Sequence, residues 1–140
     1  VTAIIYKDNL YVANVGDSRC YVLNDTGLNQ ISIDHSVVEE LVRANVITEE
    51  EARNHPRRNH ITRAMGTDEM VIVDIFKSKL KENDLILLAS DGLTGCVDKE
   101  DIKNMLLINE EISEINKKLI DMANDVSGKD NVSVILIKHK

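Results

Sequence analysis

Three aspartates each lie in a glycine-marked turn beside an apolar, strand-like run, and this pattern restricts the fold more than any other feature of the sequence. They are Asp17, Asp91 and Asp130. Turns of this kind can hold carboxylates at the rim of a sheet. Hard divalent cations prefer oxygen ligands and keep several waters, so carboxylates that converge from separate strand ends suit Mg²⁺ or Mn²⁺. The sequence therefore raises the hypothesis of a metal site at such a rim.

Each aspartate taken alone also fits an ordinary turn. Asp bonds to its own backbone and Gly accepts a positive φ, so Asp-Gly and Gly-Asp are common turn dipeptides. The metal hypothesis therefore depends on the surrounding sequence rather than on any one residue.

Strand-like patterns dominate the first part of the chain. Apolar, aromatic and β-branched residues are bounded by turn signals at residues 2–6, 10–15, 20–23 and 28–33. A hairpin turn, Asn24 to Gly27, separates the last two runs. These segments predict an antiparallel meander.

Helical spacing begins after Ser36. Apolar residues recur at helical intervals from Val37 to Val42, and Thr48 to Glu51 has the form of a capping box. Two short helices are therefore expected, and Pro56 closes the excursion. The segment 36–60 is too short to build its own core, so it is interpreted as an insertion rather than a domain.

Beyond this insertion, strands and helices are expected in turn. Residues 61–66 return toward the sheet, and the further strands are 71–76, 85–89 and 132–137, with helices at 98–107 and 112–126. The run 85–89 is nearly all apolar, which predicts a strand buried on both faces.

The composition is that of one domain with an aliphatic core. The 140 residues are 43% hydrophobic and 3% aromatic, so Leu, Ile, Val and Met must fill the core. Cys20 and Cys96 match no metal-ligand spacing, so reduced thiols and a cytoplasmic location are expected. The net charge of −7 argues against a nucleic-acid-binding surface. No apolar run reaches the roughly 18 residues that a membrane span requires.

Five short motifs occur in a fixed order along the chain. They are Val15-Gly16-Asp17-Ser18-Arg19, Asp34-His35-Ser36, Ile61-Thr62-Arg63-Ala64-Met65-Gly66, Ser90-Asp91-Gly92-Leu93 and Lys129-Asp130-Asn131-Val132. This order closely resembles the metal-dependent serine/threonine protein phosphatases of the PPM, or type 2C, class, and most of all their compact bacterial members. The resemblance runs from the first residue to the last.

The resemblance implies an α/β (α+β) fold, a four-layer α-β-β-α sandwich of two antiparallel sheets flanked by helices. Residues 1–140 would form the C-terminal portion of one phosphatase domain, with a flap-like helical insertion at 36–60. The family's first metal-binding motif, an Asp-Gly-x-Gly-Gly-like segment, has no counterpart here, nor has its upstream phosphate-binding Arg. We therefore expect an N-terminally incomplete fold, in a chain that begins inside a domain.

The resemblance also implies the chemistry, which is hydrolysis of phosphoserine and phosphothreonine in proteins by a water activated between two cations. Asp91 and Asp130 would ligate one metal of a core pair of Mn²⁺ or Mg²⁺, and Asp17 would join Asp91 at a third, weaker site. No catalytic residues beyond metal ligands are implied. The expected partners are phosphorylated Ser/Thr proteins, a Ser/Thr protein kinase among them, and the complete protein is expected to be a monomer. Because the bridging Asp is missing, this chain alone is expected to be inactive.

Other polar residues have structural interpretations. His35 is expected to pack or to hydrogen-bond within its loop rather than to act in catalysis. Arg19 and Arg63 could approach a phosphate, but an arginine in a β motif usually pairs with a carboxylate or with carbonyl groups. His55 and His60 are interpreted as exposed residues of the insertion.

Two other functions stay open at this point. A catalytically dead member of the same fold would bind a phosphoprotein or regulate a kinase, although such a protein would be free to lose the three aspartates. A simple cation-binding module explains the aspartates but not the order of the five motifs.

Overall fold

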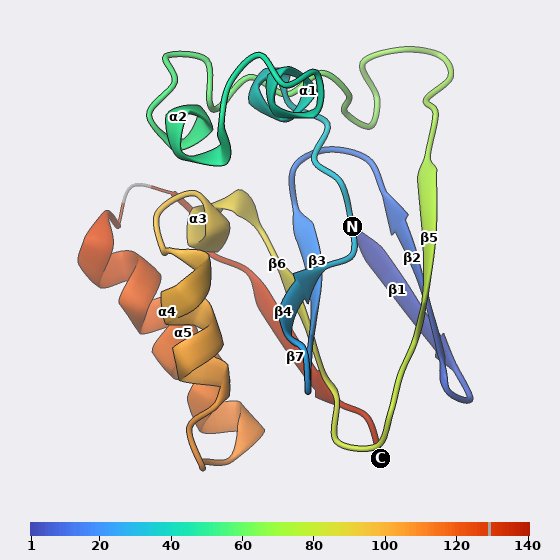
Figure 1. Ribbon diagram of the computed structural model, residues 1–140, viewed down its shortest axis with the longest axis vertical. Coiled ribbons are helices and arrows are strands. Elements are labelled where there is room, and N and C mark those ends of the chain that lie inside the picture. Colours follow the sequence, from blue (N-terminus) through green and yellow to red (C-terminus); the bar gives the residue numbers. More distant parts are fainter. Residues whose placement is uncertain (129) are drawn as a thin grey trace.

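Two antiparallel sheets form the centre of the computed structural model, which describes residues 1–128 and 130–140 (Figure 1). The first sheet has the order β1-β2-β5, with β1 at Thr2–Tyr6, β2 at Asn9–Asn14 and β5 at Asp74–Lys79. The second has the order β4-β3-β6-β7, formed by Gly27–Gln30, Arg19–Asn24, Leu85–Ala89 and Val134–Lys138. Every strand pair in both sheets is antiparallel.

The helices fall into two groups. Helices α3 (Asp91–Thr94), α4 (Lys99–Leu106) and α5 (Ile112–Val126) lie against one face of the second sheet, and α1 (Val37–Arg43) and α2 (Glu49–Arg53) lie at one end of the sandwich (Figure 1). The helix boundaries agree closely with those expected from the sequence. The short helix α3 was not expected, because its four residues carry no periodic pattern.

The two sheets pack face to face through an aliphatic core. Alternation along β2 points Leu10 and Val12 toward the second sheet, where Val22 and Ile86 join the same buried cluster. Each of these side chains is at most 1% exposed. Burial of a side chain of this size contributes about 1.5–3 kcal/mol, so this interface stabilises the position of β2 and of the turn that follows it.

A second core lies between the second sheet and its helices. The apolar stripe of α5, which includes Ile115 and Leu119, packs with Ile102 of α4 and with Leu87 of β6. Leu87 faces the helices while its neighbour Ile86 faces the other sheet. The prediction that residues 85–89 form a strand buried on both faces is therefore confirmed.

The outer face of the first sheet carries exposed apolar side chains. Ile4, Tyr6, Tyr11 and Ile75 are 64%, 63%, 37% and 67% exposed, and the register places Ile4 directly opposite Tyr11. Within residues 1–128 and 130–140, helices cover only the second sheet. The predicted sandwich of two antiparallel sheets with flanking helices is thus confirmed, and the described residues supply three of its four expected layers.

Three local expectations differ from the structure. The first four strands do not form one meander, because the chain passes from the first sheet to the second between β2 and β3. The strand expected at 71–76 lies at 74–79, where pairing with β2 sets the register. Residues 61–66 contain only an isolated bridge between Ser36 and Ile61.

The insertion is held by local caps rather than by a core. Ser36 accepts a hydrogen bond from the Glu39 amide, and Thr48 and Glu51 form the predicted capping box. Neither α1 nor α2, both fully described, contains a buried residue. In the part of the chain that the structure describes, no helix has the length and apolarity to cross a bilayer.

Candidate functional site

The strand register brings the three aspartate turns to one rim of the second sheet. Arg19 of β3 pairs with Ala89 of β6, and Ala89 pairs with Val134 of β7. Asp17 therefore lies just before β3, Asp91 just after β6 and Asp130 just before β7, all beyond the same ends of neighbouring strands. Helices α1 and α2 lie above this rim (Figure 1).

The Asp17 turn depends on the backbone of Gly16. Gly16 is buried and has a φ of +111°, a conformation that residues with a Cβ rarely adopt. Here the chain crosses from β2 to β3 and so from one sheet to the other. The glycine therefore permits the change of direction that brings Asp17 to the rim.

The Asp91 and Asp130 turns are fastened to each other. The Ser90 amide donates a hydrogen bond to the Ser133 carbonyl oxygen (3.0 Å), and the Ser133 amide donates one to Ser90 Oγ (3.0 Å). Ser90 Oγ also donates to the Asn131 carbonyl oxygen at 3.3 Å. Asp91 is thus the first residue of a helix that begins against the segment following Asp130.

Gly92 makes this contact possible because it has no Cβ. A Cβ built at Gly92 would lie 2.3 Å from the Asn131 carbonyl oxygen and 2.9 Å from its carbon. Backbone therefore packs directly on backbone between α3 and the residues after Asp130. The glycine in this motif has a steric role in addition to its place in a turn.

Asp17 and Asp91 lie close enough to interact electrostatically. Burial raises the pKa of Asp17, and the negative charge of Asp91 raises it further. Asp17 is half-buried and Asp91 is exposed. A carboxylate whose ionisation is opposed by a neighbouring carboxylate forms with it a donor pair that fits a hard divalent cation, because the cation would remove this repulsion.

The described ligand set is nevertheless partial. Within residues 1–128 and 130–140, no group of three or more His, Cys, Asp or Glu side chains is placed to hold a metal ion. Asp130 is exposed, and one of its carboxylate oxygens accepts a hydrogen bond from the next amide, that of Asn131 (2.8 Å). The assignment of Asp17, Asp91 and Asp130 as metal ligands therefore stays a prediction, supported by their common rim.

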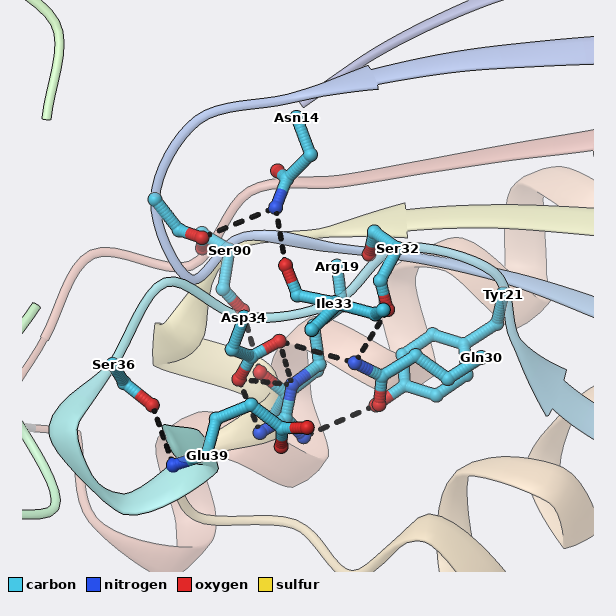
Figure 2. Close-up of polar contacts among 12 residues, drawn as sticks. Asn14, Arg19, Tyr21, Gln30, Ser32, Ile33, Asp34, Ser36, Glu39 and Ser90 are labelled. Carbon is cyan, nitrogen blue, oxygen red and sulfur yellow. Dashed lines mark hydrogen bonds and ion pairs between the residues drawn. The ribbon is translucent and has the colours of Figure 1, made fainter. Parts of the chain in front are cut away.

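A partly buried ion pair joins Arg19, the first residue of β3, to Asp34 (Figure 2). Arg19 holds the Asp34 carboxylate through Nε at 3.0 and 2.9 Å and through Nη2 at 2.7 Å. Gln30 Nε2 donates a further hydrogen bond to Asp34 at 3.0 Å. Burial opposes the charge on Arg19, but the Asp34 carboxylate overcomes this effect and the pKa of the guanidinium is raised. Arg19 is therefore committed to a carboxylate, as its sequence context predicted.

Asn14 anchors the Asp17 turn from the first sheet. Its amide Nδ2 donates to the carbonyl oxygens of Gly16 (3.1 Å) and Ile33 (2.9 Å), and its side chain is 1% exposed (Figure 2). We did not predict this role from the sequence. The signal was present, because Asn14 continues the inward face of Leu10 and Val12, and a polar residue there must find buried partners.

A second polar cluster joins His35, Arg63 and Asp74. His35 Nε2 lies 3.1 Å from Asp74 Oδ2, and Arg63 Nη1 donates to Asp74 Oδ1 at 2.9 Å. The hydrogen bond with His35 and then that with Arg63 lower the pKa of Asp74. Arg63 thus pairs with a carboxylate, as its sequence context predicted. His35 makes hydrogen bonds as expected, but its side chain contacts Gly16 and Asp74, which lie outside its own loop. Asp74 carried no sequence signal that could have identified it.

The histidines of the insertion differ in exposure. His60 is exposed as predicted, whereas the prediction for His55 is wrong because that residue is half-buried. His55 Nδ1 accepts a hydrogen bond from the Arg57 amide at 3.1 Å. Within the described residues, neither histidine belongs to a group of three or more acidic, Cys or His side chains that could hold a metal ion.

Comparison with known proteins connects this rim to a family. The family model described as "Protein phosphatase 2C" matches residues 1–132. This chain belongs to the protein phosphatase 2C family. The serine/threonine phosphatase stp of Listeria welshimeri is 41% identical over 138 residues, which cover 99% of this chain and 55% of that protein.

Solved structures of the protein phosphatase 2C family share the fold. The serine/threonine phosphatase Stp1 from Staphylococcus aureus matches with a TM-score of 0.92 and 42% identity, over 99% of this chain and 54% of its own. The catalytic domain of the phosphatase PstP in complex with two manganese ions matches with a TM-score of 0.86 and 34% identity, over 99% of this chain and 57% of its own. The chain thus spans little more than half the length of the relatives it matches.

Proposed function

We propose that this chain is part of a longer catalytic domain that hydrolyses phosphoserine and phosphothreonine in proteins by means of a metal-activated water. The observation that carries the proposal is the convergence of the Asp17, Asp91 and Asp130 turns on one rim of the sheet, in a chain of the protein phosphatase 2C family. Phosphorylated Ser/Thr proteins, a Ser/Thr protein kinase among them, are the proposed substrates.

The proposed roles of the aspartates are those that the resemblance to the family implies, and the positions of the three turns support them. Divalent cations, when bound, supply Lewis-acid activation of water and neutralise charge on the phosphoryl group. Asp91 and Asp130 would together hold one ion of a core pair of Mn²⁺ or Mg²⁺, since the Ser90 and Ser133 hydrogen bonds keep their two turns adjacent. Asp17 would share a third, weaker ion with Asp91. The PstP structure with two manganese ions supports the choice of cation.

Ser90, which directly precedes Asp91, is not placed as a nucleophile. Ser90 Oγ donates to the Asn131 carbonyl oxygen and accepts from the Ser133 amide, so its hydroxyl is engaged with the backbone. No ionisable side chain contacts it among the hydrogen bonds of the described residues. This supports attack by water rather than through a serine ester.

The proposal is tested by substituting the core ligands in a full-length protein that contains residues 1–140. Asp91→Asn and Asp130→Asn should each lower Mn²⁺-dependent hydrolysis of a phosphopeptide by at least about 100-fold, the upper end of the effect of merely orienting a ligand. Asp25→Asn is the control, because Asp25 is an exposed acid in the hairpin at the far end of β3. Near-normal turnover in a folded Asp91→Asn protein would refute the assignment.

The partial set of acidic groups also keeps a second candidate, a catalytically dead phosphoprotein-binding member, open to test. The two proposals differ for the full-length protein, which should turn over a phosphopeptide with Mn²⁺ only if it is an enzyme. For residues 1–140 alone we expect no metal-dependent turnover. Robust turnover by this isolated chain would mean that the catalytic ligands are misplaced here.

A further inference from the structure

We propose that His35 is the positioning residue of the Asp17 turn, which it clamps through both backbone polar groups of Gly16 so that the Asp17 carboxylate stays beside Asp91. The inference rests on the proposed function, because it assigns His35 to the third metal site. The proposed clamp gives His35, in the motif Asp34-His35-Ser36, a specific role beyond packing within its loop.

The clamp uses the main chain and the side chain of one residue. The His35 amide donates a hydrogen bond to the Gly16 carbonyl oxygen at 2.9 Å, and the Gly16 amide donates one to His35 Nδ1 at 3.1 Å. Both residues are buried, and His35 is 4% exposed. Loss of the ring acceptor would leave a buried amide of Gly16 without a partner.

The ring of His35 is itself fixed at its other nitrogen. Because Nδ1 accepts the Gly16 proton, the neutral ring carries its proton on Nε2, which faces Asp74 Oδ2 at 3.1 Å. Arg63 Nη1 lies 3.2 Å from the same Nε2 and pairs with Asp74. The main chain on this side is held as well, since the Thr62 amide donates to the His35 carbonyl oxygen at 2.7 Å.

The held residue is the one that needs support. Gly16 adopts a φ of +111° and immediately precedes Asp17, whose pKa is raised by burial and by the negative charge of Asp91. Repulsion between these carboxylates favours movement of the turn away from Asp91 unless its backbone is anchored. His35 thus supplies an anchor in addition to that of Asn14, and it does so from a segment that follows Asp17 by the length of two strands.

Two substitutions of His35 separate the clamp from general packing. The Oδ1 atom of Asn occupies the place of His Nδ1, so His35→Asn keeps an acceptor for the Gly16 amide and loses the contact with Asp74. Gln has its amide nitrogen at the place of His Nε2, so His35→Gln keeps the contact with Asp74 and loses the acceptor. Gln is closer to His in size, and a role in packing alone would therefore favour His35→Gln.

The experiment uses a full-length protein that contains residues 1–140 and calorimetric titration with Mn²⁺, with hydrogen exchange of the Gly16 amide measured in parallel. We expect His35→Gln to weaken the Asp17-dependent binding step by about 10- to 100-fold and to speed exchange at Gly16, while the tighter steps are unchanged. His35→Asn should retain this step within about threefold, which is well below the roughly 10- to 100-fold loss expected when a residue that orients a metal ligand is removed. Asp17→Ala identifies which binding step depends on Asp17.

Three results would overturn the inference. In the first, both His35 variants bind Mn²⁺ as the parent does, although Asp17→Ala loses one Mn²⁺-binding step. The proposed function would then stand, but His35 would have no role in it. In the second, His35→Asn is impaired more than His35→Gln, which indicates packing. In the third, the parent shows no Asp17-dependent step, which removes both the third site and its clamp.

Discussion

Gly92→Ala tests whether the close contact between α3 and the Asp130 turn shapes the metal site. The added Cβ would lie 2.3 Å from the Asn131 carbonyl oxygen, whereas real Cβ atoms essentially never approach closer than 3.0 Å. The two backbones must therefore separate by about 0.7 Å, from 2.3 to 3.0 Å, because close-packed backbone cannot absorb the overlap. Metal-ligand distances tolerate a change of about 0.2 Å. The substitution should thus disrupt the binding of one metal ion by Asp91 and Asp130 together.

Two quantities are expected to change in a full-length Gly92→Ala protein. Overpacking of this kind costs about 1–3 kcal/mol, so the free energy of unfolding in urea should fall by that amount. The Mn²⁺ affinity of the core pair, measured by calorimetry without substrate, should fall by at least about tenfold, because the ligand geometry is displaced beyond its tolerance.

Gly27→Ala is the matched control. Gly27 has a φ of +112° and open space around the place of a Cβ, so alanine there strains the backbone by about 1–3 kcal/mol without a clash. It begins β4 and pairs with Asn24, at the end of β3 away from the aspartate rim. Both variants should lose comparable stability, and only Gly92→Ala should lose Mn²⁺ affinity. Unchanged affinity in Gly92→Ala, or an equal loss in Gly27→Ala, would refute the reasoning.

Three further predictions concern residues around the rim and the core. Asp74 has a lowered pKa, so its stabilising effect is complete above the ordinary carboxyl pKa of 3.8 and is lost as the pH falls below that value. The difference in unfolding free energy between the parent and Asp74→Asn should therefore shrink as the pH falls below 3.8. A difference that grows in that range would contradict this. Arg19→Met leaves the buried Asp34 carboxylate without its charged partner, with only the Gln30 amide still donating to it among the side chains described above, and should lower the free energy of unfolding in urea by about 3 kcal/mol. A loss below about 1 kcal/mol would show that Asp34 is otherwise satisfied. Cys20 is 0% exposed, and burial raises the pKa of its thiol to about 12. An aromatic disulfide reagent at pH 8 should therefore label Cys20 only in urea, and rapid labelling of the native protein would argue against this core position.

The sequence by itself determined the elements whose pattern is local. The apolar run of residues 85–89 predicted a doubly buried strand, Thr48 and Glu51 predicted a capping box, and the stripe of α5 predicted its full length, because side-chain period and capping bonds act within one or two turns of chain. The order of five motifs identified the family. The turns of Asp17, Asp91 and Asp130 were also visible, since glycine next to aspartate marks them.

Only the tertiary structure decided which of these segments meet. Ile72 and Val73 are as apolar as a strand residue should be, yet both are exposed and β5 begins at Asp74, because register with β2 depends on the packing of the two sheets. The change of sheet at Gly16 could not be read from strand patterns, which say which face is buried but not which strand is the neighbour. The partners of His35 and the contact of Gly92 with Asn131 likewise join residues far apart in the chain. Such contacts are fixed by the close packing of the whole fold, and they place the three aspartates on one rim.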